Sequence, residues 1–514
     1  MKASAVGTAI VSVPAVLAGC GGPAAGSPPP QPPAAGAPPA AGRHSTYFDG
    51  FGVDRGLLER VIARGLARGG EYCDVYLQHK VSHWTGLEDG EVNRAYGEVA
   101  LGAGIRVLKG DATGYAFCED LSEKALLAAA ATAAAVAAGA ATVTPKALAA
   151  VPLTSTYRLQ VPWDRIGVDR KLPLLRRLDA RCRKADARIV KVRGTLMDEA
   201  SRILIADSLG RLVEDDQPMT LLYASCTAEH KGKTESSQSS VGGREGLGFY
   251  AEAAIDKLAA EAAGYTIMLF DAVPPPPGEY PIVLAPGISG MLLHEAIGHG
   301  MEADFNRKGI STFSGRIGQR VAPAFVTIVD DGTNPRLRGS INVDDEGHAA
   351  GRTLLVENGI LRSYMHDLLS SRHYQVDRTG SGRRESFRFP PVPRMRNTYM
   401  TNGPHSPQEI IGSVKKGLYA EMFTNGQVNI GAGDFTFYLK HGRLIEDGKL
   451  TRVVKDANLI GSGPKVLEHV EMVGNDLAMH SGGLTCGKDG QGVPVGVGLP
   501  TIKCGAISVG GRRS

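Results

Sequence analysis

The pattern of apolar and polar residues in the first half of the chain predicts short strands mixed with helices. Strand-like patterns cover residues 72–78, 100–109, 203–207 and 220–228. Residues 165–184 and 251–270 have helical patterns instead. Such a mixture is typical of an α/β or α+β domain, which we place at residues 47–272.

The second half of the chain shows the alternation of antiparallel strands joined by tight turns. Residues 352–357 and 360–365 flank Asn358-Gly359, and residues 444–446 and 449–453 flank Asp447-Gly448. Asn-Gly and Asp-Gly accept the positive φ angles of two-residue hairpin turns. We therefore expect an α+β protein whose C-terminal domain, residues 279–514, is mainly antiparallel sheet.

Four consecutive prolines, Pro274 to Pro277, separate the two halves. A proline run has no backbone donors, so it fits neither a helix interior nor a central strand. We predict a linker at residues 273–278.

An alanine-rich stretch, residues 125–138, predicts a helix that packs on a sheet. Asp120 and Glu123 have the spacing of a capping box for it. Alanine is too weakly lipophilic for this stretch to predict a membrane span.

The N-terminus has the pattern of a lipoprotein-type signal peptide over residues 1–20. One lysine precedes a short apolar run that ends Leu17-Ala18-Gly19-Cys20, which resembles a bacterial lipobox with Cys20 as the lipidated residue. Residues 21–46 are mostly Pro, Ala, Gly and Ser, which predicts a disordered tether. The pattern favours a lipid-anchored protein of the cell envelope. The alternative is a cytoplasmic protein with an unstructured extension.

Composition narrows the class of protein without identifying it. The 514 residues are 43% apolar and 21% charged, with a net charge of +4, which is ordinary for a globular protein. The basic residues are scattered, so we expect no nucleic-acid partner. The seven cysteines show no paired spacing and predict no disulfide framework.

One helical segment carries a metal-binding pattern, His294-Glu295-x-x-x-His299. Zinc peptidases commonly space the two histidines four residues apart, on one helix face. Five residues on a regular helix leave the side chains roughly 140° apart, whereas a π-type turn brings them nearly into line. We expect such a turn, with Gly298 absorbing the distortion. The alternative is a pair of unrelated helix histidines.

The residue types of this segment suit a hydrolytic zinc site. Imidazole nitrogens bind Zn²⁺, and the ion activates a water molecule. Glu295 is then a general base that moves the proton of this water to the leaving amine. Two histidines leave the site one ligand short.

Two other segments suggest chemistry but have simpler interpretations. Residues 482–489 approach a phosphate-binding loop, but Asp489 stands where a Ser or Thr should be. The cluster Asp344, Asp345 and Glu346 could bind a hard metal, although we expect a solvated turn. The pair Arg383-Arg384 is expected at a solvated or salt-bridged edge.

Several longer segments resemble the TldD/PmbA zinc peptidases, specifically the metal-bearing TldD branch. They are residues 294–309, Asp344-Asp345-Glu346-Gly347, residues 380–386, residues 393–400, residues 472–477 and residues 486–491, which begin Cys486-Gly487-Lys488. The resemblance runs from about residue 47 to residue 510. It implies that Cys486 is the third zinc ligand, which the residues alone would leave as one cysteine among seven.

The resemblance also implies substrates, partners and location. It implies unfolded or extended peptide substrates and a dimer, formed with a PmbA-like metal-free paralogue or with a second copy. Members of the family are cytoplasmic and lack a lipobox, so the N-terminus of this chain departs from the family.

We therefore predict a zinc-dependent peptidase with ligands His294, His299 and Cys486 and general base Glu295. The alternatives are a non-catalytic envelope scaffold with a structural zinc and an amidase that cleaves cell-wall peptides. An intact Glu295 favours the peptidase, since a structural site has no use for a base beside its ligand.

Overall fold

The computed structural model describes residues 8–12, 46–157 and 159–511, with only the backbone given for residues 8–12. Cys20 and residues 21–45 of the predicted tether lie outside the described residues, as does most of the predicted signal peptide. Lipidation at Cys20 and disorder of the tether stay predictions.

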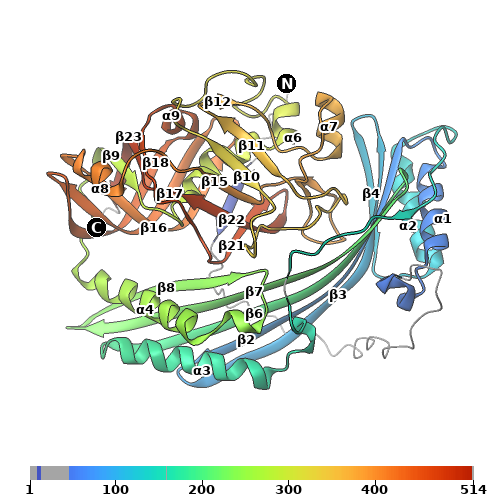
Figure 1. Ribbon diagram of the computed structural model, residues 1–514. Coiled ribbons are helices and arrows are strands. Elements are labelled where there is room, and N and C mark those ends of the chain that lie inside the picture. The colour runs from blue at the N-terminus through green and yellow to red at the C-terminus, as the bar shows by residue number, and fades with distance from the viewer. Residues whose placement is uncertain (1–7, 13–45, 158, 512–514) are drawn as a thin grey trace.

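A long, curved sheet forms the lower part of the molecule (Figure 1). Within the described residues its strands follow the order β4-β3-β2-β6-β7-β5, and β8 pairs with β7. All neighbours are antiparallel except β5 and β7. The strands are β2 (Tyr72–Glu88), β3 (Glu91–Lys109), β4 (Ala112–Cys118), β5 (Ala149–Ala150), β6 (Ile189–Asp207), β7 (Arg211–His230) and β8 (Lys233–Gly243).

The strands predicted in this half are confirmed, but they are much longer than predicted. In β3 the pattern found only the buried part, because residues 91–99 are exposed. Two-residue turns with positive φ at both positions, Asp89-Gly90 and Lys231-Gly232, close two of the hairpins.

Residue parity along the strands shows how the two faces of this sheet are covered. Cys73, Val75 and Leu77 of β2 face a core that includes α1 and α2, whereas Tyr76 points to the opposite face and packs near Phe387. The helices cover one face in two pairs, α1 with α2 and α3 with α4 (Figure 1). Their bounds are α1 (Arg55–Leu66), α2 (Glu123–Ala133), α3 (Val168–Ala185) and α4 (Glu252–Met268).

The alanine-rich helix is shorter than predicted, and its cap is different. Helix α2 begins after Ser122, whose side chain accepts a hydrogen bond from the Ala125 amide. The capping box predicted from Asp120 and Glu123 is wrong, because Asp120 instead accepts hydrogen bonds from Ser122. In the described part of the chain, no helix combines the length and apolar character needed to cross a membrane.

The second half of the chain builds a larger sheet above the first (Figure 1). Among the described residues its order is β12-β11-β10-β15-β22-β21-β1-β16-β17-β18-β23-β19, with β20 beside β22 and β9 between β16 and β23. The pairs are antiparallel except β15–β22 and β9–β16. The α+β class with a mainly antiparallel C-terminal half is confirmed.

The strands of the larger sheet are β1 (Thr8–Ser12), β9 (Gly278–Leu284), β10 (Ile328–Asp331), β11 (Arg352–Glu357), β12 (Ile360–Leu361), β15 (Asn397–Met400), β16 (Lys416–Asn429), β17 (Asp434–Glu446), β18 (Lys449–Ser462), β19 (Val470–Val473), β20 (Ala478–Met479), β21 (Leu484–Lys488), β22 (Gln491–Leu499) and β23 (Ile502–Gly511). A separate pair is β13 (Gly382–Arg383) with β14 (Val392–Pro393). The short helices of this half are α5 (Gly290–Leu293), α6 (Ala303–Arg307), α7 (Leu368–Tyr374), α8 (Pro407–Gly412) and α9 (Gly463–Glu468).

Both predicted hairpins of this half are present. Asn358 and Gly359 have φ of 48° and 78°, and Asp447 and Gly448 have φ of 47° and 73°. The strand predicted over 360–365 is too long, since β12 ends at Leu361.

Buried charges join the two halves of the molecule where solvated turns were predicted. Arg106 of β3 donates to Asp74 and, across the two halves, to Glu346 at 2.7 Å. The backbone amide of Arg384 donates to Asp345 at 2.8 Å. All five side chains are buried. The predicted solvated acidic turn is therefore wrong. Of the two expectations for the arginine pair, the salt-bridged one holds for Arg384, whose guanidinium lies 3.7 Å from Asp74, and the solvated one does not.

Candidate metal centre

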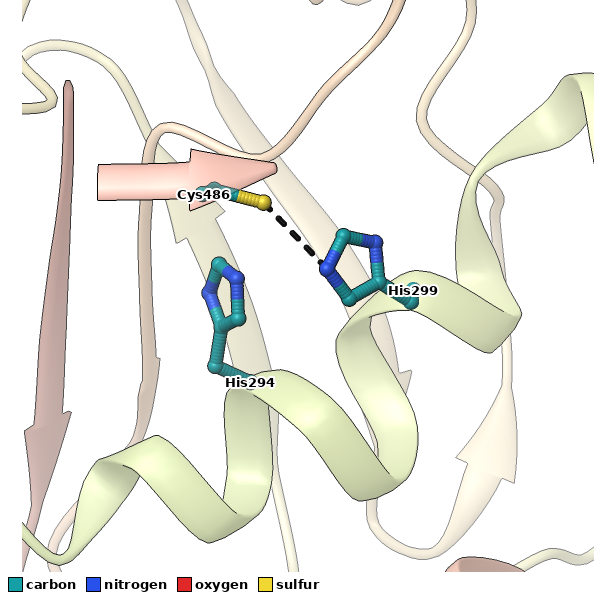
Figure 2. A group of neighbouring side chains, drawn as sticks. All are labelled: His294, His299 and Cys486. Carbon is teal, nitrogen blue, oxygen red and sulfur yellow. Dashed lines mark hydrogen bonds between the residues drawn. The ribbon is translucent and has the colours of Figure 1, made fainter. Parts of the chain in front are cut away.

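The predicted metal-binding segment is a broken helix rather than a regular one. Helix α5 continues into a π-turn, η6 (His294–Gly298), then a 3₁₀ turn, η7 (His299–Met301), and α6. The π-turn widens the spiral as the five-residue spacing requires. Both imidazoles consequently project toward Cys486 (Figure 2).

Close packing explains the glycine before the second histidine. Gly298 has φ of −58° and ψ of −49°, ordinary helical values, so the prediction that it absorbs backbone distortion is wrong. A Cβ atom built at this position would lie 2.1 Å from Sδ of Met395. Gly298 is therefore needed for contact between the π-turn and the segment that carries Met395.

Strand β21 brings Cys486 to this helix. Leu484, Cys486 and Lys488 are its buried positions, which places all three side chains on one face of the strand. Sγ of Cys486 lies 3.2 Å from Nε2 of His299, across 187 residues of sequence. The turn Asp489-Gly490, with φ of 51° and 72°, returns the chain into β22. Because a hairpin and not a helix follows, the phosphate-loop interpretation of this segment has no structural basis.

The residues His294, His299 and Cys486 meet in one buried place. One donor atom from each lies within 4.8 Å of the other two. The imidazole rings of the histidines are 5.0 Å apart between centroids and nearly perpendicular, at 84°. All three side chains have 0% exposure.

Glu302 contacts the ring nitrogen of His299 that does not face Cys486. Its Oε2 lies 2.9 Å from Nδ1 of His299, which leaves Nε2 directed at Cys486. Nζ of Lys488 lies 3.1 Å from the same carboxylate oxygen and donates to Asp304 at 2.7 Å. Arg394 donates to the backbone carbonyl of Cys486. A ring of buried, paired charges thus fixes the orientation of the histidine and the cysteine.

The pKa values show how strongly these groups interact. Burial opposes the thiolate, but the charges of His299 and Arg394 outweigh it and hold the pKa of Cys486 well below its usual range. Burial likewise opposes the charged imidazole, yet Cys486 and Glu302 raise the pKa of His299 well above its usual value. Burial raises the pKa of Glu302, but Lys488 and His299 bring it down to about 2. Cys486 and His299 thus favour a thiolate beside an imidazolium, and zinc ligation would keep this thiolate but release the imidazolium proton.

The residues present fit a zinc ion. Two imidazoles and a thiolate are ligand types that zinc prefers, and three protein ligands leave a position for water. Ligand atoms of a tetrahedral zinc lie roughly 3.3–3.6 Å apart, close to the observed separation of Cys486 and His299. Within the described residues, neither ring nitrogen of the buried His294 meets a hydrogen-bond partner. A bound cation would give a ring nitrogen of this histidine a partner.

Glu295 is fully buried on the same π-turn, directly after His294. The structure thus brings the three predicted ligands together and places Glu295 on the same π-turn as His294. The sequence interpretation missed the roles of Glu302 and Lys488. The spacing of Glu302, three residues after His299, and of Lys488, two after Cys486, was the available signal, since both spacings put side chains on a shared face.

Models of a known family match most of the chain. They are the PmbA/TldA metallopeptidase domain 1 at residues 73–137, the central domain at residues 161–269 and the C-terminal domain at residues 277–511. The chain belongs to the TldD/PmbA family of metallopeptidases.

Individual relatives agree with this assignment. The metalloprotease TldD homologue of Haemophilus influenzae is 38% identical over 86% of this chain and 93% of its own length. The zinc metalloprotease TldD homologue of Saccharolobus solfataricus is 35% identical over 46% of this chain and 53% of its own length. The crystal structure of TldE from Thermococcus kodakarensis has the same fold, with a TM-score of 0.68, 18% identity, and coverage of 88% of this chain and 100% of that one.

Proposed function

We propose that the protein is a zinc-dependent peptidase that hydrolyses unfolded or extended peptides. His294, His299 and Cys486 hold the ion, and Glu295 is the general base. The observation that carries this proposal is the convergence of two imidazoles and a thiol, from distant segments, within 4.8 Å in a buried place. The name of the Saccharolobus relative supports zinc as the metal.

The chemistry divides between the ion and the protein. When bound, zinc lowers the pKa of a water molecule and polarises the carbonyl of the scissile bond. Glu295 takes the proton of the attacking water on its carboxylate and delivers it to the leaving amine nitrogen. Glu302 keeps Nδ1 of His299 occupied, so that Nε2 is the nitrogen that faces the ion.

The surroundings of Glu295 favour catalysis over a purely structural zinc. Glu295 is fully buried on the same π-turn as His294 and follows this proposed ligand directly in sequence, which suits a base beside a bound water. We further propose, from the family, a dimer with a metal-free paralogue or a second copy, and from the N-terminal sequence, a lipid anchor at Cys20 that holds the protein in the cell envelope.

The variant Glu295→Gln tests the proposed reaction. It removes the base but leaves every proposed ligand in place, so zinc content stays at the wild-type level while hydrolysis of casein fragments falls by at least 100-fold. The variant His294→Gln is the counterpart, in which zinc itself is lost. Undiminished hydrolysis by Glu295→Gln would reject this residue as the base. Preferential cleavage of muropeptides over casein fragments would indicate the amidase instead.

A further inference from the structure

The strand β1 occupies an unusual position in the larger sheet. Its residues Thr8–Ser12 belong to the predicted signal peptide, yet they pair antiparallel with β16 on one side and with β21 on the other. Figure 1 shows this strand in blue among the strands of the C-terminal half. A segment from the far N-terminus thus completes a sheet built by residues 278–511.

The register sets β1 beside the proposed metal centre. Val11 is paired with Cys486 on β21 and with Gly426 on β16. The strand also lies against the π-turn η6, which carries His294 and Glu295. An extended chain in this position therefore passes the metal ligand on β21 and the proposed base on the π-turn.

Without β1, the sheet would have a gap one strand wide. Neighbouring strands lie about 4.8 Å apart, so β16 and β21 would face each other across roughly 10 Å with unpaired backbone groups. An extended peptide of almost any sequence could fill this gap, because the pairing uses main-chain groups. The predicted signal peptide, residues 1–20, is called the leader below. Its strand β1 and an extended substrate would then compete for one position.

We propose that residues Thr8–Ser12 occupy the extended-peptide position beside the metal centre and keep substrates out until the leader is removed. The inference rests on the proposed peptidase function. Cleavage between Gly19 and Cys20, as the lipobox pattern predicts, would take β1 away from the chain. This cut is a hydrolysis by a signal peptidase, in which water adds its hydroxyl to the Gly19 carbonyl carbon and a proton to the Cys20 nitrogen. Export and activation of the peptidase would therefore be one event.

The test uses the full chain with Cys20→Ala, which keeps the leader attached. In this background, the double substitution Ile10→Pro, Val11→Pro removes two successive backbone donors from β1, and successive donors point to opposite neighbours. The matched control is Ala24→Pro, Ala25→Pro, in a stretch already rich in proline. Two quantities are measured for each zinc-loaded protein: amide hydrogen exchange in residues 425–429 and 485–487, and the kinetics of casein-fragment hydrolysis.

We expect the β1 variant to exchange these amides at least 10-fold faster than the control and to show a KM at least 5-fold lower, with kcat unchanged. A synthetic peptide of residues 5–14 should restore slow exchange in the variant and inhibit it competitively. Equal exchange in variant and control would overturn the proposal. Exchange protection that depends on protein concentration would assign the strand to a second copy and overturn it as well.

The two proposals fail in distinguishable ways. Faster amide exchange in a zinc-bound variant that hydrolyses nothing would support the position of β1 between β16 and β21. The same result would reject the peptidase function. Equal exchange together with normal hydrolysis would reject only the role of the leader.

Discussion

At the scale of single residues, the arrangement around His299 is the most informative feature of the candidate metal centre. Its two ring nitrogens face different partners, Glu302 on one side and Cys486 on the other. The carboxylate of Glu302 is itself held by the charge of Lys488, and its pKa of about 2 keeps it ionised at any physiological pH. Glu302 is therefore a positioning residue, which would act on a bound metal only through the histidine.

The variant Glu302→Gln tests this role. Removing the charge weakens the hold on Nδ1 of His299 and leaves Lys488 with one partner fewer, so zinc affinity should fall by about 10- to 100-fold. Competition with a chromophoric chelator measures the affinity. The control is Glu421→Gln, which removes a similar carboxylate from His441, where the two side chains lie 3.3 Å apart, and should leave zinc affinity unchanged. Equal affinities in the two variants would contradict the assignment.

The sequence predicted the proposed ligands of the site, but it did not predict the buried charged residues that hold these ligands in place. Two histidines and a glutamate within six residues are visible as a pattern, and family resemblance added Cys486. Glu302 and Lys488 escaped notice because charged residues are expected at the surface, and only the fold shows that these two are buried. The same expectation led to the wrong prediction of a solvated turn at Asp344 to Glu346.

At the scale of elements, the π-turn is what allows two histidines five residues apart to project toward the same place. The five-residue spacing of the histidines predicted it, because a regular helix would separate their side chains. The reason that it packs where it does could not be read from the sequence. Gly298 faces Met395, about a hundred residues later, and nothing in the local pattern points to that contact.

The substitution Gly298→Ala should therefore destabilise the protein. The new methyl group would lie 2.1 Å from Sδ of Met395, so one of the two segments must move. We expect the free energy of unfolding to fall by about 1–3 kcal/mol and zinc content to decrease. Urea denaturation and metal analysis measure the two effects.

The control for this substitution is Gly264→Ala in α4, where a Cβ would meet no atom within 4 Å. Both changes raise helix propensity, so the control should be neutral or more stable by up to about 1 kcal/mol. The double variant Gly298→Ala, Met395→Ala should recover zinc binding, since it removes the clashing side chain. Equal stability of the two single variants would contradict the packing argument.

At the scale of the whole molecule, buried charge pairs fix the half that carries the candidate metal centre against the curved sheet. The pattern of apolar residues predicted the strands of that sheet but not that both of its faces are covered. Tyr76 and Arg106 point to the face opposite the helices, where they meet the C-terminal half. How the two halves pack against each other depends on contacts between residues hundreds of positions apart. The local periodicity of the sequence does not predict such contacts.

The variant Arg106→Met should show what this junction contributes. It leaves the carboxylates of Asp74 and Glu346 buried without their main partner, at a cost of about 3–5 kcal/mol in the free energy of unfolding. Arg60→Met, which breaks an exposed pair with Glu123, should cost about 1 kcal/mol or less. Similar losses in the two variants, measured by urea denaturation, would show that the buried pairs do not hold the halves together.

The most direct test of the account is X-ray absorption at the zinc edge of the purified, zinc-loaded full chain. We predict a coordination shell with one sulfur at about 2.3 Å and two imidazole nitrogens at about 2.0 Å, and the loss of the sulfur in Cys486→Ser. A shell without sulfur, or one that keeps its sulfur in Cys486→Ser, would contradict the metal centre on which the proposed function depends.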